Sequence, residues 1–98
     1  MPISKDRKKY FRQLGHELKP LVTIAGNGLS ASVVSELERA LEDHELIKVK
    51  LNVEDRPTLQ AAVCSQLNAE LVQAVGKVIL IYREAKKPNP KLSNLISK

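Results

Sequence analysis

Residues 21–30 read Leu-Val-Thr-Ile-Ala-Gly-Asn-Gly-Leu-Ser and carry the signals for a strand, a tight turn and the start of a helix. Pro20 ends any preceding helix, and the largely apolar run 21–24 predicts a strand that is buried on both faces. Residues 25–28 predict a tight turn, because Gly and Asn tolerate positive φ. Ser30 predicts a helix start, because its hydroxyl can accept a hydrogen bond from a free amide of the first turn.

Apolar periodicity extends this alternation of strands and helices along the chain. It predicts helices over 5–18, 31–43 and 57–69, and strands over 46–53, 70–75 and 78–82. Gly76 and Lys77 fit the turn of a hairpin between the last two strands. The order α-β-α-β-α-β-β indicates an α/β fold with a four-stranded mixed sheet and three helices. Right-handed crossovers would pack the second and third helices against the sheet, and we expect the first helix at the margin of the sheet.

The predicted strand 46–53 has a two-residue alternation. Ile47 and every second residue after it are apolar, whereas Lys48 and Lys50 stand between them. Successive side chains of a strand point to opposite faces, so this pattern predicts one packed face and one face that shows two lysines.

The predicted helix 5–18 separates apolar from cationic side chains. At about 100° per residue, Phe11, Leu14 and Leu18 fall within one narrow arc. The opposite side carries basic residues and no acid, namely Lys5, Lys8, Lys9, Arg12 and His16. We expect Phe11 to dock the helix while the cationic side faces solvent.

Positive charge is concentrated at the two ends of the chain. The net charge of +5 is distributed as +4 over 1–20, −3 over 21–82 and +4 over 83–98. Such segregation favours a polyanionic partner that meets the ends, with a solvated basic helix and tail as the alternative interpretation. We expect a domain over residues 1–83 followed by a basic, flexible tail over residues 84–98.

The sequence does not support several other classes of protein. No run approaches the roughly 18 apolar residues of a membrane span, and the first residues lack a secretory h-region. Cys64 is the single cysteine, which suits a reducing cytoplasm and predicts a small core side chain. His16, His44 and Cys64 are too scattered to bind a metal, and the run 43–45 (Asp-His-Glu) predicts a solvated helix end rather than an acid–base pair. We therefore expect no catalytic residue, metal, cofactor, small-molecule substrate or membrane partner.

Four blocks of sequence form a set: HELKP at 16–20, GNGL at 26–29, LEDHELIKVK at 41–50 and VGKVILIYR at 75–83. Together they closely resemble the bacterial YhbY family, the stand-alone form of the CRM domain that also occurs in plant organelle group II intron splicing factors. The resemblance covers roughly residues 4–83 in unbroken order.

The resemblance implies a fold similar to that of the C-terminal domain of translation initiation factor three. It also implies RNA binding and association with precursors of the large ribosomal subunit, so that residues 1–83 would form a CRM-type RNA-binding domain. The Gly-x-x-Gly loop of the family, which is like that of KH domains, maps onto residues 25–28, where Ala25 replaces the first glycine. If the turn needs positive φ at that residue, either Ala25 is strained or the loop is shifted by one residue.

We therefore predict an RNA-binding, non-enzymatic protein. The expected RNA-contacting residues are Ala25, Gly26, Asn27, Gly28, Lys5, Lys8, Lys9, Arg12, Lys19, Lys48 and Lys50. We expect the glycine turn and the basic helix to lie together on one exposed side and to contact the phosphates of ribosomal RNA, with the protein acting as a cytoplasmic monomer. The alternative is a protein-interaction adapter on a ribonucleoprotein complex that uses the acidic side of helix 31–43, including Glu38 and Glu42.

Overall fold

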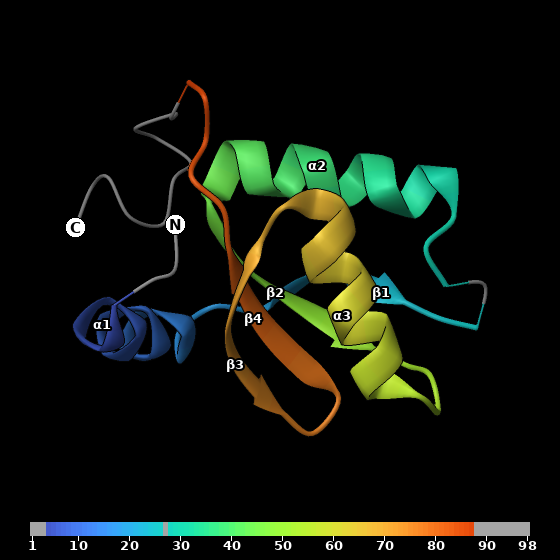
Figure 1. The fold of residues 1–98 in the computed structure, drawn as a ribbon, viewed down its shortest axis with the longest axis horizontal. Coiled ribbons are helices and arrows are strands. Elements are labelled where there is room, and N and C mark those ends of the chain that lie inside the picture. Colours follow the sequence, from blue (N-terminus) through green and yellow to red (C-terminus); the bar gives the residue numbers. More distant parts are fainter. Residues whose placement is uncertain (1–3, 27, 88–98) are drawn as a thin grey trace.

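The computed structural model describes residues 4–26 and 28–87. Along the chain it contains α1 (Lys5–Gly15), β1 (Pro20–Ile24), α2 (Ala31–His44), β2 (Leu46–Leu51), α3 (Arg56–Leu67), β3 (Glu70–Val75) and β4 (Val78–Tyr82). This order of helices and strands confirms the order predicted from the sequence (Figure 1).

Polar side chains cap the first turn of each of these helices, and the predicted cap at Ser30 is confirmed. The hydroxyls of Ser4 and Ser30 each accept a hydrogen bond from the amide three residues further on, at 3.2 and 3.3 Å. The Asp55 carboxylate accepts from both the amide and the hydroxyl of Thr58, at 3.3 and 2.7 Å. Each cap satisfies an amide that has no partner inside its helix and thereby sets where the helix begins.

Three elements end earlier than the sequence predicts. α1 ends at Gly15 rather than at residue 18, because the next three amides donate to carbonyls three residues back and tighten the chain into a turn. α3 ends at Leu67 because Asn68 adopts the left-handed conformation, with φ 54°. β2 ends at Leu51, where the chain turns away toward the cap of α3.

The strands form one mixed sheet in the order β1-β2-β4-β3. β1 runs parallel to β2, and β4 runs antiparallel to both of its neighbours. The hairpin therefore inserts its second strand between β2 and β3, which makes β2 and β4 the central strands (Figure 1). The predicted mixed sheet is confirmed.

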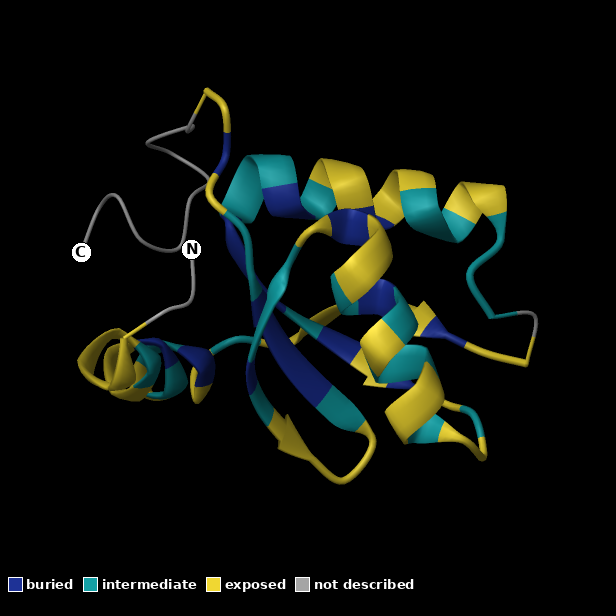
Figure 2. Cartoon of the chain, in the orientation of Figure 1, coloured by how far each residue is buried: buried dark blue, intermediate teal, exposed yellow. Residues whose placement is uncertain are grey.

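The main core lies between the sheet and the layer formed by α2 and α3. Val49 of β2 and Ile81 of β4 are fully buried there against Leu37 of α2 and Val63 of α3. The two helices lie on one face of the sheet, with their outward sides exposed (Figure 2). Packing of α2 and α3 against the sheet is therefore as predicted.

α1 packs on the opposite face of the sheet and not at its margin. Phe11 is 1% exposed and contacts Leu46, Val72 and Leu80, one from each of β2, β3 and β4. Leu46 points toward α1 because side chains alternate along β2, whereas Ile47 points into the main core. The predicted marginal position is wrong, since the apolar arc of the helix is buried only on the face of the sheet.

β1 is buried on one face only. Val22 and Ile24 join the main core, but Leu21 is 50% exposed and Thr23 is also exposed. α1 makes its main contacts with β2 and β3, so this edge of the sheet stays open on the α1 side. The predicted burial of β1 on both faces is therefore wrong.

Phe11 anchors α1, so Phe11→Ala should strongly destabilise the protein. Removal of a fully buried phenyl ring leaves a cavity and lowers the free energy of unfolding by about 3–5 kcal/mol. Urea unfolding followed by circular dichroism measures this loss. Tyr10→Ala is the control, because the neighbouring Tyr10 is 42% exposed and should cost far less. Equal losses in the two variants would contradict the role of Phe11.

Candidate nucleic-acid interface

The turn between β1 and α2 is open to solvent, and Ala25 fits it without strain. The Gly28 amide donates to the Ala25 carbonyl at 2.9 Å and closes the turn. Gly28 has φ +65°, whereas Ala25 does not adopt a positive φ. Apart from chain neighbours, no described atom lies within 4 Å of where a Cβ would stand on Gly26 or Gly28. The turn is thus as predicted at these three residues, and Asn27 lies outside the described residues.

α1 carries its outward cations in two adjacent rows. Lys8, Arg12 and His16 are spaced four residues apart, which aligns them along one line of the helix surface. Lys5 and Lys9 form the second row, and both are exposed. The first row runs down the helix to the point where the chain leaves it for the sheet.

The turn and the basic helix lie at opposite ends of the molecule. The longest dimension of the molecule is 35 Å, and Figure 1 shows α1 at one end of it and the β1–α2 turn at the other. β1 leads the chain away from α1 and toward the turn. The expectation that the two features share one side is wrong, and a single phosphate group cannot contact both.

Three lysines lie between α1 and the turn. Lys48 lines one hollow together with His16 and a second hollow together with Lys19. Lys50 pairs with Thr23 of β1, two residues before the turn begins. Both β2 lysines face away from the main core, as the alternation predicts. We call the following set the basic path: Lys8, Arg12, His16, Lys19, Lys48 and Lys50.

Tyr82 packs against α1 at the end of β4 and remains partly exposed. Its ring lies 4.8 Å from the ring of Phe11, and the Arg7 guanidinium stands 5.5 Å from its centroid. These contacts hold α1 against the sheet and engage the exposed Arg7 within the chain. Tyr82 lines a different hollow from the one that His16 and Lys48 line, so it is not part of the basic path.

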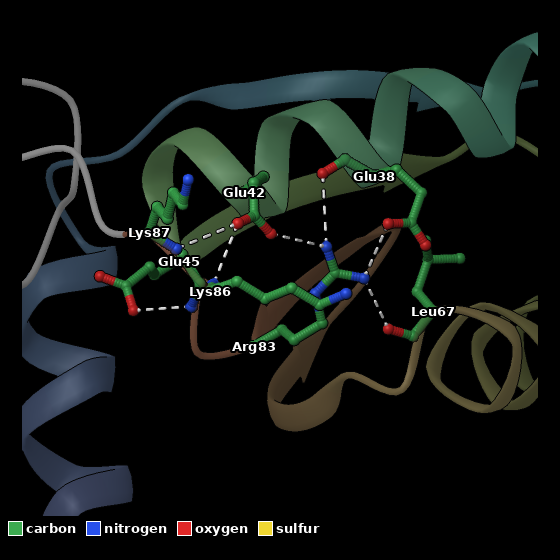
Figure 3. A network of polar contacts seen from close by, with 8 residues as sticks. Glu38, Glu42, Glu45, Leu67, Arg83, Lys86 and Lys87 are labelled. Carbon is green, nitrogen blue, oxygen red and sulfur yellow. Dashed lines mark hydrogen bonds and ion pairs between the residues drawn. The ribbon is translucent and has the colours of Figure 1, made fainter.

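The acidic side of α2 is engaged by an arginine of the same chain. The Arg83 guanidinium lies 3.0 Å from Glu38 Oε2 and 3.5 Å from Glu42 Oε2. It also donates to the carbonyl of Leu67 at 3.0 Å, at the end of α3 (Figure 3). One side chain thus ties the end of β4 to both helices. The two glutamates of the adapter alternative are consequently occupied within the domain.

Glu45 is buried, not solvated as predicted for the end of α2. It is 4% exposed, has φ 63° and joins α2 directly to β2. Its carboxylate accepts from the Ala85 amide at 3.0 Å (Figure 3), and its carbonyl accepts from the Arg83 amide at 2.9 Å. A helix that passes straight into a central strand carries its last residue into the interior, which explains the difference.

The start of the predicted flexible tail is held against α2. Ala85 is 5% exposed, and Glu42 Oε1 accepts from the amides of Lys86 and Lys87 at 2.9 and 3.4 Å (Figure 3). Ala85 is thus buried where an exposed tail was expected, whereas Glu84, Lys86 and Lys87 are exposed as expected. Residues 88–98 lie outside the described part of the chain.

Cys64 is a half-buried side chain at the edge of the main core. Burial, and to a lesser extent the nearby negative charge of Glu70, raises the pKa of its thiol. Among residues 4–26 and 28–87, no three His, Cys, Asp or Glu side chains gather where they could hold a metal ion. Within the same residues, no helix has the length and apolar character needed to cross a membrane.

The Cys64 thiol should react slowly with iodoacetamide at neutral pH. The thiolate is the reacting form, and a raised pKa lowers its population while packing limits access. Alkylation rates measured by mass spectrometry, in buffer and in urea, test this expectation. The unfolded chain should react severalfold faster, and equal rates would contradict it.

Gln73 and His16 also lie on the α1 face of the sheet, although neither is among the RNA-contacting residues predicted from the sequence. Both line a hollow with Lys48. A bulge between Leu71 and Gln73 interrupts the alternation, so Val72 packs under α1 and Gln73 faces the same side. Strict alternation places Gln73 on the other face, and the run 70–75 contains no glycine or proline to mark the bulge.

Fold and surface together define a small mixed α/β domain with a basic path along a half-open sheet face. A family model described as the CRS1 / YhbY (CRM) domain matches residues 3–83. The chain is 49% identical over 98 residues to the "Probable RNA-binding protein PA4753" of Pseudomonas aeruginosa, covering 97% of this chain and 94% of that protein. It is 40% identical over 84 residues to an "RNA-binding protein" of Haemophilus influenzae, and the match covers 83% of this chain and 85% of that protein.

A solved structure has the same fold. The solution structure of the hypothetical protein SAV1595 from Staphylococcus aureus superimposes with a TM-score of 0.74 at 33% identity, over 87% of this chain and 92% of that one. The chain belongs to the CRS1/YhbY (CRM) domain family. The family resemblance of the four sequence blocks is thereby confirmed.

Proposed function

We propose that this protein binds structured RNA along the basic path and recognises mainly the phosphate backbone. The observation that carries the proposal is the position of Lys48 and Lys50. They stand on a central strand, on the part of the sheet left open by α1, between the basic helix and the glycine turn. The names of the two bacterial relatives support RNA as the partner.

The distribution of charge orients the RNA on the domain. The basic path lies on the α1 face, whereas the acidic residues Glu36 and Asp43 belong to α2 on the opposite face. A polyanion is attracted to the first face and repelled by the second. Because the helix and the turn stand far apart, several phosphates of one RNA must contact the protein at once. Phosphate contacts by lysines position an RNA without reading its sequence.

Replacing Lys48 and Lys50 by Gln should weaken RNA binding and its dependence on salt. Each lost phosphate contact should reduce the slope of log affinity against log salt by about 0.7–0.9. Fluorescence anisotropy with a labelled, folded RNA, repeated at several salt concentrations, measures both quantities. Unchanged affinity in Lys48→Gln/Lys50→Gln, or a wild-type affinity that does not depend on salt, would overturn the proposed interface.

The matched control is Arg39→Gln/Arg56→Gln, which removes the same charge from the opposite side of the sheet. Arg39 on α2 has an 87% exposed side chain, and Arg56 begins α3. This control should bind RNA nearly as well as the wild type. An equal loss in both double variants would show that net charge, and not the basic path, governs binding.

We further propose that the RNA belongs to precursors of the large ribosomal subunit and that the protein acts on it as a cytoplasmic monomer without a catalytic step. This finer assignment is supported by the resemblance to the YhbY family. Ultraviolet crosslinking in cells, followed by sequencing of the attached RNA, should recover precursor ribosomal RNA. The Lys48→Gln/Lys50→Gln variant is the control and should recover less. Enrichment of messenger RNA alone would contradict the assignment while leaving RNA binding intact.

A further inference from the structure

A hollow of about 420 Å³ lies on the open part of the sheet, beside the C-terminal end of α1. Its volume falls within the range of about 300–1,000 Å³ that is usual for sites of small organic groups. The hollow interrupts the basic path between His16 and Lys48, which both line it. Any RNA that follows the path therefore crosses the hollow.

Part of the lining of the hollow is apolar. Val78 and Leu80 of β4 and Val75 of β3 line it, and Val75 is 64% exposed. Exposed apolar surface inside a cationic field suits a ligand that has an apolar, flat part and a negative part. A nucleotide has both, because its base presents an apolar face and its phosphate carries the charge.

The polar part of the lining carries no negative charge. It consists of His16, Lys48 and Gln73, and none of the described residues that line the hollow is acidic. A glutamine amide both donates and accepts, and it can form two hydrogen bonds with the edge of an adenine. A larger hollow near Tyr82 lacks this complementarity, because Glu70 and Glu84 line it.

Two backbone features build this hollow. The bulge in β3 brings Gln73 to the α1 face, beside Leu80. Gly15 lets the last turn of α1 approach the sheet closely, since a Cβ on Gly15 would stand 2.6 Å from Leu80 Cδ2. His16 follows Gly15 directly and lines the hollow.

We propose that this hollow receives one unpaired nucleotide of the bound RNA, an inference that rests on the proposed function and deepens it. The base lies against Val75, Val78 and Leu80 with its edge toward Gln73. The adjoining phosphates lie on Lys48 and Lys50. The preferred RNA is therefore a stem interrupted by a bulge or a loop, not a continuous duplex.

Two RNA hairpins that differ by one base test the proposal. One carries a single unpaired adenosine in its stem, and the other carries an abasic nucleotide at the same place, so the number of phosphates is equal. The wild-type protein should bind the adenosine hairpin about fivefold more tightly. This is the low end of the effect of stacking one base on an aromatic side chain, and the apolar side chains of the hollow are aliphatic. Gln73→Ala/Val75→Ala should abolish this preference while keeping the affinity for the abasic hairpin.

Matched variants separate the hollow from the phosphate contacts. Gln66→Ala changes an exposed glutamine of α3 and should keep the preference. Lys50→Gln should weaken binding of both hairpins by the same factor. A urea midpoint for each variant shows that the fold is retained. If Gln73→Ala/Val75→Ala does not fold, the test uses the methyl NMR signals of Val75, Val78 and Leu80 in the wild-type protein instead. These signals should shift only when the adenosine hairpin is added.

The outcomes distinguish the two proposals. Equal, salt-dependent binding of both hairpins by the wild type would overturn the hollow as a nucleotide site and leave the proposed function standing. A preference that survives in Gln73→Ala/Val75→Ala would also overturn it. Failure of the wild type to bind either hairpin, or any folded RNA, would overturn both proposals.

Discussion

The alternation of side chains along β2 is the constraint on which the rest of the structure depends. A strand must send successive side chains to opposite faces. Ile47 and Val49 therefore build the core with α2 and α3, while Leu46 closes the contact with α1. Lys48 and Lys50 are left on the part of the face that α1 does not reach. The same six-residue strand thus organises the interior and presents the central cations of the surface.

The sequence blocks that carry the family resemblance are mostly structural. Residues 41–50 contain the end of α2, the Glu45 joint and nearly all of β2. Residues 75–83 contain the hairpin turn, β4 and Arg83, whose guanidinium binds both outer helices. These blocks thus build a fold in which one sheet face stays partly uncovered. The basic residues of α1 and β2 give that face its positive charge.

Much of the fold follows from local pattern, but its assembly does not. Periodicity and caps predict the type and order of each element, because these depend on neighbours along the chain. Three features do not follow from local pattern, namely the position of α1, the one-sided burial of β1 and the insertion of β4 between β2 and β3. They depend on which element covers which part of the sheet, and that is decided by residues far apart in the sequence. The role of Gln73 depends on a bulge that its own strand does not signal. Lys48 and Lys50 were predictable because regular alternation decides where they point.

The junction between α2 and β2 has a consequence for how this domain can vary. Glu45 alone separates the helix from the strand, so the length of this connection sets the parity of every residue that follows in β2. One inserted or deleted residue would turn Ile47 and Val49 outward and drive Lys48 and Lys50 into the core. The number of residues in this junction therefore decides whether the α1 face of the sheet carries lysines or apolar side chains.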